Sequence, residues 1–225
     1  MTEIYDEENE LHRFRAGSGV FRDDRTGLFA RIIDAWRDMA GSTRRLIDEN
    51  PSEARLLFFV LMSDLMFFLS WTIKTVVNPD SIVASAMPKD VALLLVGALL
   101  LRTTSVYIFA LIVGLFLRAV GGKGTLKDTR CGIFWGSFVA APFGLLAAFL
   151  AVGMSSLEDV IPLFRNETVG LAPLWLGLLP FVWFVSAGAA EAHGFKRVFP
   201  LFAGLSLLCV VGLVWAMYLR ANGVI

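Results

Sequence analysis

The sequence has little cysteine, little histidine and no excess of charge of either sign. Its 225 residues include two cysteines, two histidines, 20 basic and 20 acidic residues. Cys131 and Cys209 are too few for a disulfide framework or a cysteine-rich metal site. Because phosphate binding requires a basic excess and the net charge is zero, we expect no nucleic-acid partner.

The sequence is instead rich in apolar residues, at 56% against 18% charged, which is typical of an integral membrane protein. More than half of the charged residues lie before Leu56, so a polar amino-terminal part precedes an apolar body. A bilayer core requires roughly 20 apolar residues per helix. Five segments qualify: 56–73, 91–117, 131–152, 168–190 and 198–219.

These segments predict an all-α fold, a polytopic membrane helical bundle with five transmembrane helices and an N-terminal cytoplasmic amphipathic helix. The predicted division is a disordered cytoplasmic tail over 1–27, an amphipathic interfacial helix and linker over 28–50, and a five-span membrane domain over 51–225. Asn50, as a cap, and Pro51 mark the start of the first membrane helix. Residues 78–80 mark its end, and the glycines of residues 121–124 mark the end of the second.

The interfacial helix is predicted from apolar residues at helical spacing. Charged residues occupy its opposite side, so the helix is expected to lie in the headgroup layer or to pack on the cytoplasmic end of the bundle. Its apolar residues are Leu28, Phe29, Ile32, Ile33, Trp36 and Met39.

Lys and Arg in the short loops indicate the orientation of the bundle. One side has only Lys74, Lys89, Arg165 and Arg220. The other side is more basic, and we expect it to face the cytoplasm together with the amino terminus, which leaves the carboxyl terminus outside. Its cations are Arg37, Arg44, Arg45, Arg55, Arg118, Lys123, Lys127, Arg130, Lys196 and Arg197.

Two charged residues, Asp64 and Arg102, interrupt the first two spans, and charges at membrane depth are costly. Counted at about 1.5 Å per residue, Asp64 lies about 12 Å and Arg102 about 24 Å from the cytoplasmic boundary. They are therefore not expected to be level, although a water-linked pairing stays open. Together with Thr103 and Thr104 they are candidates for a polar path. The alternative is that each is a tolerated polar residue.

Small residues recur every four positions in two spans, and such faces allow helix backbones to approach closely. They predict a helix-packing interface, either within the bundle or with another chain. Pro142 and Pro180 lie inside spans three and four, where proline frees a carbonyl group. The small residues are Ala110, Gly114, Ala140, Gly144 and Ala148.

Other polar groups do not form a recognisable catalytic or cofactor site. Glu191 and His193 fall on the same face of the membrane as Asp128 and Cys131, but no zinc-ligand spacing is present. The glycine-rich stretch 121–125 lacks the spacing of a phosphate-binding loop. We therefore expect no catalytic residues, no metal, no cofactor and no enzymatic activity. A lipid-directed enzyme using Glu191 and His193 is the weakest alternative.

Several segments together resemble a known family. They are ENPSEARLLF, the turn LRAVGGKGT, the third span RCGIFWGSFVAAPFGLL and the end of the fourth span, AEAHGFKRVF. Over residues 32–219 the chain resembles the bacterial branch of the Yip family, five-span membrane proteins named after eukaryotic Ypt/Rab-interacting proteins. The resemblance implies the fold, the cytoplasmic amino-terminal part and a bacterial inner membrane with a periplasmic carboxyl terminus. It brings no catalytic residues.

The leading functional hypothesis is a non-enzymatic inner-membrane protein that acts by helix–helix association, as a scaffold, membrane-shaping or accessory and assembly factor. Its expected partners are the lipid bilayer and either another membrane protein or further copies of the chain. The alternative is a small transporter or channel with a polar path at Asp64 and Arg102.

Overall fold

The computed structural model describes residues 27–77 and 88–222, which form helices and no strand. The predicted tail up to residue 26 and the helix end at residues 78–80 lie outside the described residues. The helices are α2 (Leu28–Arg37), α3 (Met39–Asp48), α4 (Glu53–Val77), α6 (Pro88–Ala119), α7 (Leu126–Ser156), η1 (Pro162–Arg165), α8 (Glu167–Gly170), α9 (Ala172–Ala192) and α10 (Phe199–Ala221).

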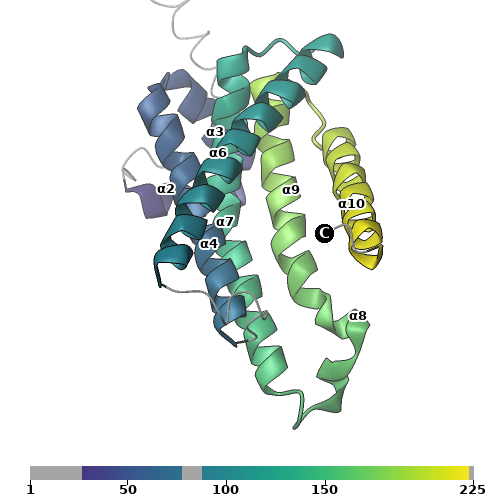
Figure 1. Ribbon diagram of the computed structural model, residues 1–225. Helices are drawn as coiled ribbons and strands as arrows, with labels where there is room; N and C mark the ends of the chain where they lie inside the picture. Colours follow the sequence, from purple (N-terminus) through teal and green to yellow (C-terminus); the bar gives the residue numbers. More distant parts are fainter. Residues whose placement is uncertain (1–26, 78–87, 223–225) are drawn as a thin grey trace, which may run out of the picture.

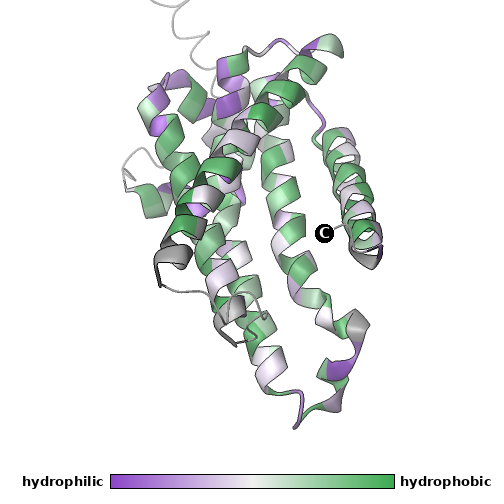
Figure 2. Cartoon of the chain, viewed as in Figure 1, coloured by the Kyte–Doolittle hydropathy of each residue, from purple (hydrophilic) through white to green (hydrophobic). Residues whose placement is uncertain are grey.

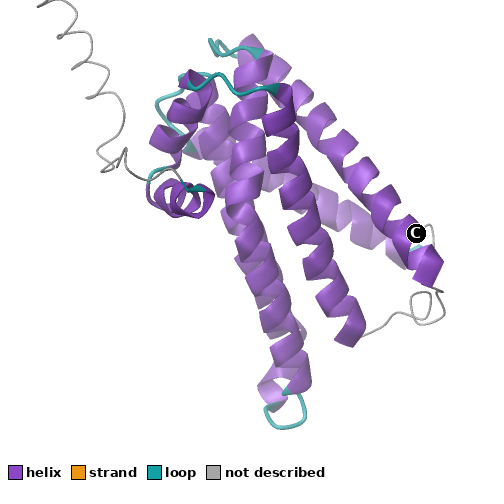
Figure 3. Cartoon of the chain, turned by 90° about the vertical axis from the view of Figure 1, so that its left-hand side faces the viewer, coloured by secondary structure: helices purple, strands orange, loops and turns teal. Residues whose placement is uncertain are grey.

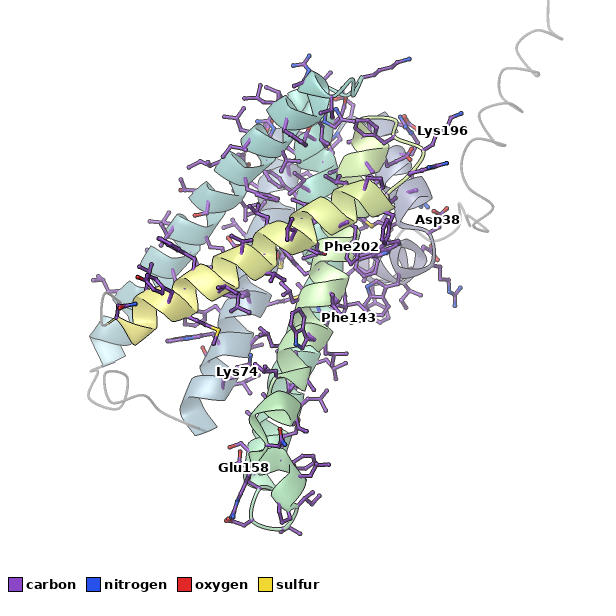
Figure 4. All side chains as sticks on the ribbon, turned by 90° about the vertical axis from the view of Figure 1, so that its right-hand side faces the viewer. Asp38, Lys74, Phe143, Glu158, Lys196 and Phe202 are labelled. Atoms are coloured by element: carbon purple, nitrogen blue, oxygen red, sulfur yellow. The ribbon has the colours of Figure 1, made fainter. Side chains whose placement is uncertain are left out.

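Five of these helices, α4, α6, α7, α9 and α10, are long and apolar enough to cross a bilayer, and they stand together as a bundle (Figure 1). The predicted five-span all-α fold is therefore confirmed. Figure 2 shows apolar residues along the long helices and polar residues gathered at the two ends of the bundle. We call the end that carries α3, Arg118 and Lys196 the basic end. Lys74 and Glu158 lie towards the opposite end (Figure 4).

The centre of the bundle is the pair α7 and α9, whose backbones touch. A Cβ atom added to Gly132 would fall on the carbonyl oxygen of Gly188, and one added to Gly188 would fall on that of Gly132. One turn further along α7, a Cβ atom on Gly136 would lie 2.7 Å from the carbonyl oxygen of Phe184. Only glycine permits this approach, because every other residue carries the Cβ atom that would clash.

The remaining helices pack around this pair. Helix α4 lies on α7, α6 lies on α4 and α7, α3 lies on α9 and α7, and α10 lies on α9. Aromatic side chains fill the contact between α4 and α7: the Phe59 ring centroid is 5.1 Å from that of Trp135 and 5.7 Å from that of Phe138. All three residues are buried, so this apolar contact adds to the stability of the core.

Helix starts follow local capping, and one differs from expectation. Asn50 does not cap the first membrane helix, because it adopts a left-handed conformation (φ 47°) just after α3. Ser52 takes that position, and its hydroxyl accepts a hydrogen bond from the Arg55 amide at 3.3 Å. Asparagine tolerates the left-handed region better than most residues, so it suits the end of a helix as well as a start.

Other helix boundaries also differ from the predicted ones. Helix α7 begins at Leu126, earlier than the predicted third span, because Thr125 and Asp128 form a reciprocal capping box. The fourth span begins at Ala172, after a break that follows α8, with Pro173 in its first turn. Pro142 and Pro180 lie inside α7 and α9 as predicted.

The amphipathic stretch is two helices and not one. Asp38 ends α2 and caps α3 by accepting a hydrogen bond from the Gly41 amide at 2.9 Å. Met39 therefore begins α3, whereas the sequence placed it on the apolar face of a single helix. The stretch expected as a linker forms most of α3.

Candidate functional site

Asp64 and Arg102 form a direct ion pair between α4 and α6. The Asp64 side chain is fully buried, and that of Arg102 is 22% exposed. Thr103 completes the site, because its hydroxyl donates a 2.6 Å hydrogen bond to Asp64 Oδ2. A carboxylate removed from solvent is stable when its charge is paired and its oxygens accept hydrogen bonds, and this carboxylate has both.

The sequence placed Asp64 and Arg102 at different heights and left only an indirect or water-linked pairing open, whereas the structure joins them directly. The expectation counted height as residues along each helix, which assumes that both helices stand parallel to the bundle axis. Figures 1 and 3 show that α6 is inclined to the other long helices. The height gained per residue along α6 is therefore smaller than the helical rise, so Arg102 lies closer to the level of Asp64 than the count of residues suggests.

The ion pair is connected to its surroundings on two sides. Arg102 Nη2 donates to the Ser63 hydroxyl at 3.4 Å, and Ser63 in turn donates to the Ser137 carbonyl oxygen of α7 at 3.3 Å. The Arg102 guanidinium carbon also lies 4.8 Å from the centroid of the Phe67 ring, in a cation–π contact. Thr104, predicted beside Thr103, is exposed and does not join the site.

A second polar cluster lies at the basic end, where the turn Gly121–Thr125 meets the end of α9. His193 is buried, and its Nε2 lies 2.8 Å from the Thr129 hydroxyl oxygen. That hydroxyl donates its single hydrogen to the Thr125 carbonyl oxygen at 2.9 Å. Nε2 must therefore be the donor, which leaves Nδ1 as an unprotonated nitrogen against Gly122.

Burial and the charge of Arg118 lower the pKa of His193, and the smaller opposing effect of Asp128 does not reverse this. The imidazole is therefore neutral in the folded chain at neutral pH. The backbone of His193 also fixes the α6–α7 turn to α9, because its carbonyl oxygen accepts a hydrogen bond from the Lys123 amide at 3.2 Å.

Glu191 and His193, two residues apart, bind different elements. Glu191 Oε1 accepts a 2.8 Å hydrogen bond from Arg44 Nε, which fixes α3 to the end of α9. Asp128 is part of the capping box of α7, and Cys131 is buried. Among the described residues, no three His, Cys, Asp or Glu side chains are grouped so that they could hold a metal ion.

A charged network also joins α2, α3 and the start of α4. Glu49 binds Arg31 at 2.8 Å and Arg55 at 2.7 Å. Burial alone would raise the pKa of Glu49, but the hydrogen bonds and charges of the two arginines outweigh it and lower that pKa.

Helix α2 follows the grey amino-terminal trace in Figure 3, where it is seen nearly end-on and so lies across the long helices. Ile32 is buried, and Trp36 Nε1 donates to the Val139 carbonyl oxygen at 2.9 Å. Leu28 and Phe29 are exposed, and Ile33 is half-buried. The apolar face thus packs partly on α7 and partly faces outward.

The predicted small residues pack inside the chain. Ala110, Ala140 and Ala148 are buried, and a Cβ atom on Gly114 would lie 2.9 Å from Leu126. Gly144 is not part of a close contact on its own Cβ side, because a Cβ atom added there would meet nothing within 4 Å, although one added to Gly177 would lie 3.6 Å from the Gly144 Cα atom. The closest contact, through Gly132, Gly136 and Gly188, was not predicted, although the four-residue spacing of the first two was a visible signal.

Helix α10 is the least covered of the five long helices. No residue of its span Phe199–Leu219 is buried, and residues 210–218 are all exposed. Its first turns pack on the bundle, with the Phe202 ring 5.4 Å from that of Trp183. Figure 4 shows α10 crossing the bundle obliquely, so it diverges from α9 towards the opposite end.

Comparison with known proteins identifies one matching family. The family model described as the Yip1 domain matches residues 34–219, from the end of α2 through nearly all of α10. No curated protein and no solved structure matches the chain. The matched region contains the α7–α9 pair, the Asp64–Arg102 ion pair and the His193 cluster. Since the match covers most of its length, this multi-pass membrane protein belongs to the Yip1 domain family.

Proposed function

We propose that the protein is a non-enzymatic scaffold or assembly factor that associates with other membrane helices through α10. The observation that carries this proposal is the exposure of residues 210–218, a stretch of α10 that diverges from α9 with its apolar side chains unburied. Helix association in a bilayer depends on packing between side chains, and this part of α10 has a free surface on which a partner helix can pack.

The rest of the bundle suits a scaffold. The touching backbones of α7 and α9 and the ion pair between α4 and α6 join the other long helices into one unit. Its small residues are used within the chain, so they support cohesion of the bundle and not a docking face. Helix α2, with Phe29 exposed, supports an additional contact with the interfacial layer of the lipid.

The transporter alternative is not favoured. The Asp64 carboxylate is engaged by Arg102 and Thr103, so its charge is already neutralised within the protein. A proton or substrate relay normally uses several ionisable groups in sequence. Flux through reconstituted vesicles that was lost on changing Asp64→Asn would revive this alternative.

Photocrosslinking tests the proposed association. A benzophenone amino acid at Val211 or Val214 of α10 is expected to give one crosslinked protein band in native membranes. Leu100 and Leu101 of α6 are exposed to a similar degree and serve as control positions. Crosslinks to lipid alone at all four positions, with no protein adduct at α10, would contradict the proposal.

We also propose that the basic end faces the cytoplasm of a bacterium and that the carboxyl terminus is periplasmic. The excess of cations at the basic end supports this orientation. A carboxyl-terminal alkaline phosphatase fusion is expected to be active, and a fluorescent protein at the same site is expected to be dark. The reverse pattern would place the carboxyl terminus in the cytoplasm.

A further inference from the structure

Two glycine turns meet at the basic end and hold each other in place. One joins α6 to α7, and the other joins α9 to α10. Gly121 (φ 96°) and Gly194 (φ 72°) give each turn its left-handed residue. The Lys123 amide donates to the His193 carbonyl oxygen at 3.2 Å, and the Gly122 backbone lies against the His193 ring. The backbones of the two turns are therefore held next to each other.

Four exposed cations surround these turns: Arg118, Lys123, Lys196 and Arg197, which we call the basic corner. Figure 4 shows Lys196 at the surface of this end. Among the described residues, none of the four forms an ion pair with a carboxylate. By contrast, other arginines of this end do so: Arg31 and Arg55 with Glu49, Arg44 with Glu191, and Arg130 with Glu53.

The basic corner also borders the apolar surface of two membrane helices. Arg118 lies one residue before the end of α6, and Arg197 lies two residues before the start of α10. Val120 and Phe199, beside them in sequence, are 54% and 69% exposed. Uncompensated positive charge next to exposed apolar side chains, where a span enters the bilayer, matches a phospholipid with an anionic headgroup.

We propose that the basic corner binds an anionic phospholipid, with the headgroup phosphate on Lys123, Lys196 and Arg197 and the acyl chains along Val120 and Phe199. An acidic protein segment would satisfy the charges but would leave these two apolar side chains uncovered. The site does not depend on association through α10, since it lies at the other end of that helix.

Native mass spectrometry of the full chain in mild detergent tests this, with phosphatidylglycerol and phosphatidylcholine of identical acyl chains as probes. The wild type is expected to retain phosphatidylglycerol preferentially, and less of it as ionic strength rises. In the variant Lys196→Gln/Arg197→Gln, retention is expected to fall about thirtyfold, the effect of two cations near a membrane surface.

The variant Lys74→Gln/Arg165→Gln is the matched control, because it removes the same charge at the opposite end of the bundle. It is expected to retain phosphatidylglycerol like the wild type, and both variants are expected to keep the wild-type unfolding temperature. Equal loss in both variants, or no loss in the first, would overturn the proposal. Displacement by glycerol phosphate at the same concentration as the lipid would also overturn it, because the site would then bind a free anion.

Discussion

At the scale of single residues, several charged side chains of the described residues pair with a partner on another helix. Asp64 depends on Arg102 of α6, and Glu191 depends on Arg44 of α3. Neither partner lies within one helical turn of the other, so helical periodicity could not reveal the pairs. The sequence marked Asp64 and Arg102 as unusual, and the packing of α6 against α4 brings them together.

The variant Asp64→Asn is expected to lower the free energy of unfolding by about 3 kcal/mol, because it leaves the largely buried Arg102 charge unpaired. The double variant Asp64→Asn/Arg102→Leu is expected to recover much of this loss. Equilibrium unfolding in a denaturing detergent, followed by circular dichroism, measures both. Thr104→Val, at an exposed neighbour, is the control, and additive losses in the double variant would contradict direct pairing.

His193 predicts a pH dependence of stability. Its pKa in the folded chain lies below the ordinary value of 6.5, so the unfolded chain binds the proton more readily. The stability contributed by neutral His193 is present in full above pH 6.5. It is lost as the pH falls through 6.5 towards the lowered pKa, with a slope of at most about 1.4 kcal/mol per pH unit.

The variant His193→Gln is expected to flatten this dependence between pH 7 and pH 5, because a glutamine side chain does not titrate there. Unfolding measured at several pH values tests the prediction. An unchanged slope in the variant would show that the pH dependence comes from other groups. His12, the second histidine of the sequence, can be replaced in parallel as a control.

At the scale of elements, the number of membrane helices could be predicted because it depends on local composition. A predominantly apolar run of about 20 residues must be helical in a bilayer, whatever its neighbours are. The ends of the helices were harder to predict. Asn50 and Ser52 are both suitable N-cap residues, and only the left-handed backbone of Asn50 distinguishes them. The break at Asp38 was missed because the apolar spacing continues through it.

The close contact of α7 with α9 predicts that replacing glycine by alanine has opposite effects on stability at two positions of α7. Gly132→Ala is expected to lower the free energy of unfolding by about 3 kcal/mol, because the added methyl group meets the backbone of Gly188. Gly153→Ala, also in α7, meets nothing within 4 Å and is expected to be neutral or to add about 1 kcal/mol of stability. Similar losses for both variants, again from unfolding in a denaturing detergent, would contradict the close approach.

At the scale of the whole molecule, stability and association are expected to use separate surfaces. Replacing Val211, Val214 and Trp215 by leucine keeps the span apolar and touches no core contact, so the free energy of unfolding is expected to change by less than about 0.5 kcal/mol. The same variant is expected to lose its crosslinked or copurified partner. A partner retained in full would show that association uses another face.

The sequence alone determined the five spans, the basic end, the polar amino-terminal part and the family. These features depend on local composition and on short motifs, which hold in any arrangement of the helices. The tertiary structure alone decided that Asp64 meets Arg102, that His193 binds Thr129, that Gly132 touches Gly188 and that α10 stays exposed. These depend on the relative tilt and height of helices distant in sequence, and neither periodicity nor hydropathy contains that information.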